Sequence, residues 1–179
     1  MSEGAQAHPF VRGVRGVQAV RVVRVGEEGW RELRAVRLRA LASDPAAFGS
    51  TLAREQAYDD ALWRERAAAG RTFLAWASGL VVGLVSYYPE EDRPADERQL
   101  VSMWVAPEAR GAGVAALLVE AVRAAAAADG ARVLTLFVAD GNERARRLYE
   151  RLGFRSTGER ETLPSDPERG EERYALALT

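Results

Sequence analysis

The chain has 179 residues, 47% of them apolar, and this length suits one well-buried domain better than two. Its 25 basic and 26 acidic residues leave a formal net charge of -1, so no overall positive field favours nucleic acid or an anionic membrane as a partner. The lack of cysteine excludes disulfides, thiolate metal sites and a cysteine nucleophile. The single histidine, His8, precedes the first predicted element, which argues against a histidine triad or a zinc site.

The sequence also indicates where the domain begins and in which cellular compartment the protein resides. Residues 1–17 are expected to form a flexible leader, and a single domain is expected over residues 18–179. No segment approaches the roughly 20 consecutive apolar residues of a membrane span, and the N-terminus lacks the apolar core of a secretory signal. We therefore expect a cytoplasmic protein. The abundance of arginine and alanine indicates a GC-rich genome, which favours a bacterial source.

The first half of the domain combines strand and helix patterns. Residues 18–25 alternate apolar and basic side chains, which predicts a half-buried strand. Apolar residues then recur at helical spacing over 27–42, and Asp44-Pro45 ends this helix. The segment 51–69 is interpreted as one helix or as two short ones.

A hairpin and a further strand follow. Residues 72–77 and 80–88 are dense in β-branched and aromatic side chains and are joined by Ser78-Gly79, a pattern typical of two strands connected by a tight turn. Residues 89–98 are polar and contain proline, which predicts a surface loop. The fourth predicted strand is 99–105.

The second half opens with a glycine turn and an amphipathic helix. Apolar residues at i, i+3, i+4, i+7, i+8 and i+11 from Val114 predict a helix that packs on a sheet and ends at Asp129-Gly130. The apolar run 132–139 predicts a central strand buried on both faces. The order strand, helix, strand predicts a right-handed βαβ unit, so the fourth and fifth strands should run parallel.

One more helix and two strands complete the chain. Asn142 can cap a helix that extends to Leu152, and Gly153 is placed to end it. The last strands are predicted around 154–160 and 172–178, joined by a polar loop at 164–170.

The glycine turn after the fourth strand is the clearest chemical signal. Gly111 and Gly113 let the backbone approach a ligand closely, and the free N–H groups at the positive end of the next helix favour a phosphate group. The turn lacks the third glycine of a dinucleotide fingerprint and the Gly-Lys-Ser/Thr of a P-loop, which argues against NAD or ATP. On this stretch alone, a tight turn without a ligand is the alternative.

Two motifs resemble those of one family. The run Val105–Ala115, VAPEARGAGVA, resembles the acyl-CoA loop of the GNAT superfamily of N-acetyltransferases. Its signature, Arg/Gln-x-x-Gly-x-Gly/Ala, is met by Arg110, Gly113 and Ala115. The run 142–154, NERARRLYERLGF, is similar to the family's Asn-x-x-Ala-x-x-Leu-Tyr-x-x-x-Gly-Phe pattern. The two motifs occur in the family's order, and the predicted elements also match the family's from the first strand to the last.

The resemblance implies an α/β fold in which helices flank a mixed, mostly antiparallel sheet of about six to seven strands, with a V-shaped split between the fourth and fifth. The pantetheine arm of acetyl-CoA would enter the split and pair with the edge of the fourth strand at Met103, Trp104 and Val105. The pyrophosphate would be held at the helix N-terminus. The backbone amides concerned are those of Arg110, Gly111, Ala112, Gly113, Val114 and Ala115.

The resemblance also implies catalytic roles. Acetyl transfer from a thioester to an amine needs a neutral amine, stabilisation of charge on the thioester oxygen and a proton for the departing thiolate. The backbone N–H near Val105 would polarise the carbonyl, and Tyr149 lies where the family's tyrosine acts as general acid on the sulfur. Tyr149 also belongs to an apolar stripe, which leaves open a role as a core aromatic only. Asn142 would contact the cofactor, cap its helix, or do both, and Ala145 would lie beside the cofactor.

The general base is where the chain departs from the family's common pattern. Many relatives carry a glutamate near the start of the fourth strand, where this chain has Gln99, and an amide does not accept a proton at neutral pH. Glu97 is the tentative base. Asp96 or Glu55 acting through a water, or loss of the proton to solvent, are the alternatives. Each carboxylate could instead be a solvated surface charge.

These observations predict an enzyme that moves the acetyl group of acetyl-CoA directly to a primary amine of a small molecule, a protein or a peptide. The alternative is a non-catalytic acyl-CoA-binding or sensing module on the same fold, which the missing glutamate keeps open. No metal is expected, and neither nucleic acid nor a membrane is expected as a partner. By resemblance, the exposed edges of terminal strands favour a homodimer. The identity of the acceptor amine stays open.

Overall fold

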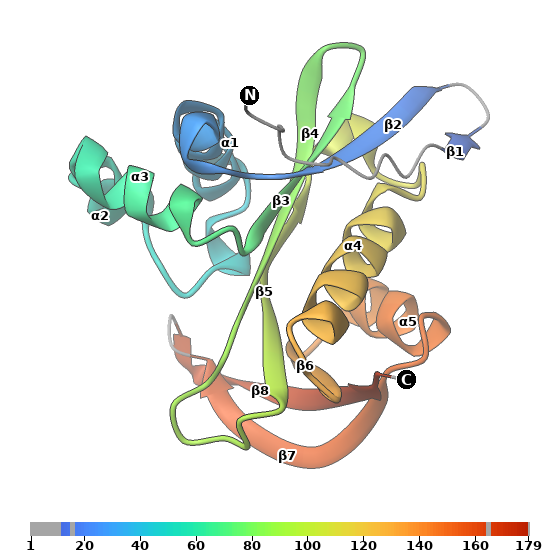
Figure 1. Cartoon of the computed structure of the whole chain (residues 1–179). Helices are drawn as coiled ribbons and strands as arrows, with labels where there is room; N and C mark the ends of the chain where they lie inside the picture. Colours follow the sequence, from blue (N-terminus) through green and yellow to red (C-terminus); the bar gives the residue numbers. More distant parts are fainter. Residues whose placement is uncertain (1–11, 15–16, 164–165, 179) are drawn as a thin grey trace.

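An eight-stranded sheet runs through the part of the chain that the computed structural model describes, residues 12–14, 17–163 and 166–178 (Figure 1). Neighbouring strands follow the order β1-β2-β3-β4-β5-β6-β8-β7, and every neighbouring pair is antiparallel except β5 and β6. The strands span β1 Arg12–Val14, β2 Val17–Arg24, β3 Thr72–Ala77, β4 Leu80–Tyr88, β5 Glu97–Val105, β6 Val133–Ala139, β7 Arg155–Leu163 and β8 Asp166–Ala177. The strands β2 to β8 correspond to the predicted ones.

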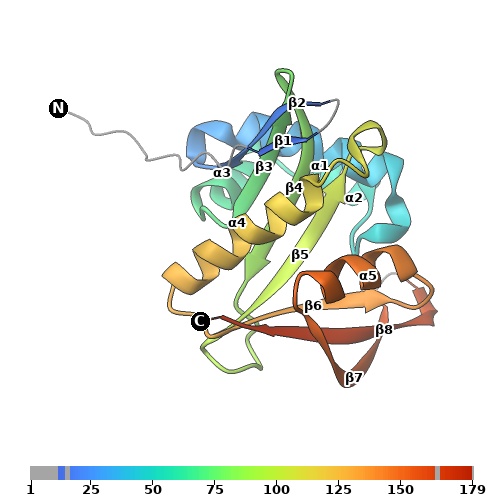
Figure 2. The same cartoon turned by 90° about the vertical axis from the view of Figure 1, so that its right-hand side faces the viewer.

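Helices cover both faces of this sheet. They span α1 Trp30–Ser43, α2 Leu52–Gln56, α3 Asp60–Ala68, α4 Val114–Ala128 and α5 Glu143–Arg151, with 3-10 turns at Glu27–Gly29, Pro45–Ala47 and Pro107–Ala109. The helices α1, α2 and α3 lie on one side of the sheet, and α4 and α5 lie on the other (Figure 1 and Figure 2). The predicted architecture, a mostly antiparallel sheet flanked by helices, is confirmed.

The strands β5 and β6 separate after a short parallel contact. They pair only where Glu97, Arg98 and Gln99 lie opposite Val133, Leu134 and Thr135. Beyond this contact β5 stays paired with β4, and β6 stays paired with β8, so the sheet opens into two arms. Figure 2 shows β5 rising away from β6. The V-shaped split predicted between the fourth and fifth strands is therefore present, and the two strands run parallel as predicted.

A close contact at Gly83 fixes α4 beside this split. A Cβ atom at Gly83 would lie 3.0 Å from the Leu118 side chain, 3.0 Å from the Trp104 carbonyl oxygen and 3.3 Å from the Val114 side chain. Both α4 residues are in the core, with Leu118 0% and Val114 2% exposed. Only glycine leaves room for a helix this close to the strand, so the N-terminal half of α4 has a fixed position against the sheet.

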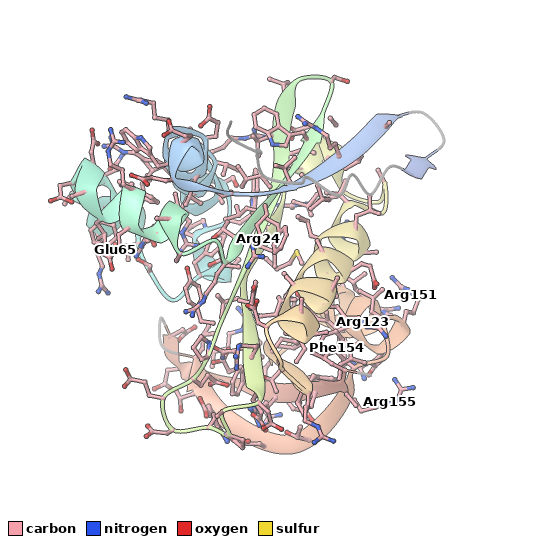
Figure 3. The ribbon with its side chains drawn as sticks, in the orientation of Figure 1. Arg24, Glu65, Arg123, Arg151, Phe154 and Arg155 are labelled. Carbon is pink, nitrogen blue, oxygen red and sulfur yellow. The ribbon has the colours of Figure 1, made fainter. Side chains whose placement is uncertain are left out.

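The C-terminal strands and α5 are held together by aromatic residues. The rings of Tyr149 and Phe154 meet edge to face with centroids 5.7 Å apart, and Phe154 is 0% exposed. Figure 3 shows Phe154 inside the molecule, while Arg151 and Arg155 on either side of it in the sequence project outward. Two residues of the 142–154 motif, Tyr149 and Phe154, therefore anchor the predicted helix over 142–152 in the core.

Some predicted boundaries differ from the structure. The segment 51–69 forms two helices, because Asp59 caps α3 by accepting the N–H of Leu62 at 2.9 Å. The strand predicted from Gln99 begins at Glu97. The polar loop predicted at 164–170 is wrong from Asp166 onward, where β8 begins. These residues pair with β7, whose mostly exposed side chains give no apolar pattern to detect.

The N-terminal region is described only in part. Residues 1–11, 15 and 16 lie outside the described residues, and with them lie His8 and most of the predicted leader, as do residues 164, 165 and 179. Within that leader, Arg12–Val14 forms the short strand β1, which pairs with β2.

Candidate active site

A cleft of about 980 Å³ occupies the split between β5 and β6. Its walls are β5 from Leu100 to Val105 and β6 from Leu136 to Ala139, and its ends are formed by the α4 turn, α5 and the strands β7 and β8. The cleft is lined by most of the predicted site residues: Met103, Trp104, Val105, Arg110, Gly111, Gly113, Val114, Ala115, Asn142, Ala145 and Tyr149. The two that do not line it are Ala112 and Glu97. The volume is typical of a small-molecule or cofactor site.

The N-terminus of α4 brings unpaired backbone donors to the cleft. Gly113 caps the helix with a φ of 78°, and Gly111 has a φ of 87°, both in the left-handed region that glycine adopts without strain. Counting from Gly111, the first backbone N–H with an acceptor in the described chain is that of Leu117, which donates to the Gly113 carbonyl at 3.2 Å. Within the described chain the N–H groups of residues 111–116 have no acceptor. Such a row at the positive end of a helix suits a phosphate group.

Asp44 connects three elements at the rim of the cleft. Its Oδ2 accepts hydrogen bonds from Arg110 Nη2 at 2.7 Å and from the indole Nε1 of Trp104 at 2.8 Å. Burial opposes ionisation of Asp44, but the bonds from Trp104, Ser43 and Arg110 outweigh burial and hold its pKa below the ordinary value. The carboxylate therefore stays charged and keeps Arg110 beside the α4 turn.

Val105 directs its backbone into the split. Its carbonyl accepts a hydrogen bond from Arg110 Nε at 2.9 Å, whereas the N–H of Ala106 bonds to the Val82 carbonyl of β4 at 2.9 Å. Successive residues of an antiparallel ladder alternate in direction, so the polar groups of Val105 point away from β4. The N–H of Val105 is therefore directed toward the side on which β5 has no partner strand.

Tyr149 reaches the cleft from α5. The residue is 6% exposed and its ring packs in the core, so the interpretation as a core aromatic holds for the ring. Burial raises the pKa of its hydroxyl, which no hydrogen bond joins to any other residue that the structure describes. The hydroxyl is therefore protonated at neutral pH and can donate to a group in the cleft.

Asn142 caps α5. Its Oδ1 accepts the N–H of Ala145 at 3.1 Å, and both residues line the cleft. The predicted helix cap is confirmed, and a contact of Asn142 or Ala145 with a cofactor stays a prediction.

A bulge in β5 shapes the middle of the cleft. The β4–β5 register shifts between Leu84 and Ser86, and opposite this shift Ser102 has a φ of 58°, which is unusual for a residue with a side chain. Ser102 Oγ accepts a hydrogen bond from Arg37 Nη1 at 3.2 Å. Arg37 also binds Glu55, which is 1% exposed, through two nitrogens. The helices α1 and α2 thus brace the bulge.

The residues considered as general bases do not line the cleft. Glu97 lies in the paired segment of β5, and its Oε2 is 2.6 Å from Nη2 of Arg173. Glu55 is enclosed in its ion pair, and Asp96 is an exposed loop residue. Gln99 also belongs to the paired segment. Because β5 and β6 are still hydrogen-bonded up to Gln99, the cleft begins only beyond these positions.

Two other carboxylates do line the cleft, those of Asp44 and Glu171. Glu171 belongs to β8, where it lies opposite Ala139 of β6. Sequence reasoning missed it because it adjoins the segment assigned to a polar loop and because nothing local distinguishes it from Glu172. Extending the strand pattern toward Asp166 would have put the two glutamates on opposite faces.

The sequence profile of the acetyltransferase (GNAT) family matches residues 35–154. The match includes β5, the α4 turn, β6 and α5, which form most of the cleft. The chain belongs to this family. No protein of curated function matches this GNAT chain in sequence.

Solved structures of acetyltransferases share its fold. An N-acetyltransferase from Staphylococcus aureus Mu50 is 20% identical, with a TM-score of 0.71, over 89% of this chain and 99% of its own. The ribosomal-protein-alanine N-acetyltransferase from Brucella melitensis is 21% identical, with a TM-score of 0.69, over 88% and 99%. The acetyltransferase candidate yncA from Salmonella typhimurium, solved with its cofactor acetyl-CoA, is 17% identical, with a TM-score of 0.71, over 89% and 94%. At these identities the likeness concerns the fold.

None of the helices formed by the described residues is long and apolar enough to cross a membrane. The same residues contain no group of three or more His, Asp or Glu side chains placed to hold a metal ion.

Proposed function

We propose that this GNAT protein is an N-acetyltransferase that moves the acetyl group of acetyl-CoA directly to a primary amine. The observation that carries the proposal is the row of unpaired N–H groups at the N-terminus of α4, which adjoins a cleft between separated strands. A ligand with a pyrophosphate and a long extended arm fits both features. Family membership and the acetyl-CoA-bound neighbour from Salmonella typhimurium support the same choice.

The residues of the cleft suit the two parts of the ligand. The pyrophosphate would accept hydrogen bonds from the backbone of residues 111–115, because the N–H of Arg110 is already bonded to the Pro107 carbonyl at 3.3 Å. Arg110 would act through its guanidinium, which lies beside these residues. The pantetheine arm would lie along the free edge of β5 at Met103, Trp104 and Val105, where its amides can pair as an added strand does.

The thioester would then lie between Val105 and Tyr149. Attack of a neutral amine on the carbonyl carbon places negative charge on the oxygen, and the N–H of Val105 would stabilise that charge. As the carbon–sulfur bond breaks, Tyr149 would supply the proton for the thiolate. The amine attacks directly, so this route needs no nucleophilic side chain.

An acyl-CoA-binding module without turnover is the second candidate function. It is favoured by Gln99 and by the ion pair that occupies Glu97, because neither residue is available to take a proton from an amine in the cleft. Thiol release from acetyl-CoA distinguishes the two candidates when it is measured with spermidine, kanamycin, L-lysine and a tetra-alanine peptide. We expect release with at least one amine, whereas binding without release for every amine would favour the module.

We also propose a cytoplasmic, bacterial protein that forms a homodimer and binds no nucleic acid. The near-neutral net charge of -1 supports the last point. The edge strand β7 carries mostly exposed side chains and has β8 as its one neighbour in the described sheet, so its free edge is available for pairing with a second copy. The mass of the protein in solution, measured by light scattering, tests the dimer.

A further inference from the structure

One carboxylate in the cleft has no cationic partner. Glu171 lines the cleft from β8, and its side chain forms no ion pair or hydrogen bond with any other described residue. The surrounding carboxylates are engaged by arginines: Arg173 binds Glu90, Glu97 and Glu159, and Arg93 binds Glu159 and Glu161. Glu171 is therefore the carboxylate of this group that is left for a cation from outside the chain.

The strand register places Glu171 on the face of the C-terminal strands opposite α5. Leu176 of β8 faces α5, because a Cβ atom at Gly153, directly after α5, would lie 3.2 Å from its side chain, and Tyr174, two residues away, shares that face. The pairing of β8 with β6 is continuous from residue 171 to residue 177, so side chains alternate between the two faces along this stretch. Glu171 is three residues from Tyr174 and so points to the other face. Tyr149 comes from α5 itself, so the two side chains approach the cleft from opposite sides.

The charged groups around Glu171 come from several elements. Glu161 of β7 lies directly opposite Glu171, and Arg173 of β8 is occupied by three glutamates. Arg169 of β8 donates to the carbonyl of Asp140 at 2.7 Å, while the Asp140 carboxylate is bound by Arg160. The other charged residues that line the cleft are Asp44, Arg110, Arg144 and Arg151. Burial, and then the charge of Glu161, raise the pKa of Glu171 above its ordinary value, which suits a proton acceptor that works near neutral pH.

We propose that Glu171 receives the acceptor amine, binding its ammonium group and taking a proton from it. The inference rests on the proposed acetyl transfer and adds the class of acceptor: a primary amine that carries a positive charge before it reacts. The amine would approach from the Glu171 side of the split, and the thiolate would leave on the Tyr149 side. Acid and base on opposite sides of the thioester keep the two proton transfers apart.

The protons balance in this scheme. The ammonium group carries three protons, and Glu171 takes one of them, which leaves the neutral amine that attacks the carbonyl carbon. The new carbon–nitrogen bond forms, the carbon–sulfur bond breaks, and Tyr149 gives its proton to the sulfur. A second proton leaves the nitrogen and restores Tyr149, the third stays on the amide, and Glu171 releases its proton to solvent. The products are the N-acetyl amine, CoA and one proton.

The test compares Glu171→Gln with Glu161→Gln in the full chain. Glu171→Gln keeps the shape of the side chain and breaks no bond of the structure, whereas Glu161→Gln removes an equal charge from the adjacent strand outside the cleft. Binding of acetyl-CoA is measured by calorimetry and kcat/KM by thiol release with the best amine of the panel, from pH 5 to pH 9. Glu171→Asp serves as a second variant, and thermal unfolding checks that each variant is folded.

We expect Glu171→Gln to lower kcat/KM for the amine by about 100-fold or more, which is the usual contribution of a general base to the rate. Its affinity for acetyl-CoA should be unchanged. Its rate should lose the rise with pH that the wild type shows as Glu171 ionises. Glu161→Gln should keep its rate and move that rise to lower pH, because the neighbouring negative charge is gone. Glu171→Asp should lie between the wild type and Glu171→Gln.

The outcomes separate this inference from the proposed function. A Glu171→Gln variant that acetylates the amine at the wild-type rate with the wild-type pH profile would overturn the role of Glu171 and leave acetyl transfer intact. A wild-type protein that does not bind acetyl-CoA would overturn the proposed function. Binding of acetyl-CoA with no transfer to any amine of the panel would overturn both.

Discussion

The guanidinium of Arg110 is held between the carboxylate of Asp44, at 2.7 Å, and the carbonyl of Val105, at 2.9 Å. This arrangement joins the end of α1, the end of β5 and the turn before α4. It fixes a positive charge next to the row of N–H groups at the helix N-terminus. The helix N-terminus and the guanidinium of Arg110, whose charge Asp44 partly offsets, therefore lie at one end of the cleft and favour an anionic ligand group there.

Replacement of Arg110 tests this arrangement. Arg110→Ala should weaken acetyl-CoA binding by about tenfold or more, since a hydrogen bond to a charged group contributes roughly 1.5–3 kcal/mol. The affinity for S-acetylpantetheine, which lacks the pyrophosphate, should not change. Calorimetric titration with both ligands measures the difference. An equal loss for both would mean that Arg110 shapes the whole cleft and does not act on the pyrophosphate.

Substitution of two glycines, one at each end of α4, distinguishes an effect on ligand binding from an effect of backbone strain. Gly113 and Gly130 have φ values of 78° and 81°, so a valine at either position costs about 1–2 kcal/mol of strain. Gly113→Val and Gly130→Val should lower the melting temperature to a similar extent. Only Gly113→Val should weaken acetyl-CoA, because its side chain crowds the phosphate-facing backbone. If Gly113→Val binds acetyl-CoA as tightly as the wild type, the loop is a tight turn that does not bind the pyrophosphate.

Tyr149→Phe tests the general acid. The ring and its contact with Phe154 are kept, so stability and acetyl-CoA affinity should stay near the wild-type values. The thiolate loses its proton donor, and kcat should fall about 100-fold. Steady-state kinetics beside a binding titration give the two values separately. A wild-type kcat would remove Tyr149 from the mechanism.

The buried ion pair of Arg37 and Glu55 predicts a large effect on stability. Glu55→Gln leaves Arg37 without its partner and should lower the free energy of unfolding by about 3–5 kcal/mol. Asp60→Asn, which breaks the exposed pair with Arg34, is the control and should cost less than about 1 kcal/mol. Urea denaturation measures both. Similar values for the two variants would contradict the account of the buried pair.

The same pair predicts a pH dependence. Burial opposes charge on Glu55, but Arg37 more than compensates, so the pKa is held below the ordinary 4.5. A lowered pKa contributes stability that is fully present above the unfolded value and is lost as the pH falls through the folded value. The wild type should therefore lose stability more steeply below pH 4.5 than Glu55→Gln does. Parallel curves from denaturation at a series of pH values would argue against this.

The order of the elements and one end of the site could be predicted from the sequence because both depend on local patterns. The apolar stripe that starts at Val114 and the continuous run 132–139 report burial directly. Gly111 and Gly113 indicate a turn whose backbone lies open to a ligand, and both glycines have left-handed φ values there. Asn142 as the cap of α5 follows from residue type and position alone.

The rest of the site depends on contacts that are distant in the sequence. Whether Glu97 faces the cleft is decided by where β5 and β6 separate, and that point lies beyond Gln99. Whether Glu171 faces it is decided by the register of β8 on β6. The strands β7 and β8 carry polar residues along an outer edge, so hydropathy marks neither their length nor their register. A carboxylate on such a strand can be assigned to the site only once the fold is known.

The most direct test of the account is calorimetric titration of the purified protein with acetyl-CoA and, separately, with S-acetylpantetheine. The account predicts one acetyl-CoA site per chain and much weaker binding of S-acetylpantetheine, because the backbone of residues 111–115 binds the pyrophosphate. Equal affinity for the two ligands, or no binding of acetyl-CoA, would contradict it.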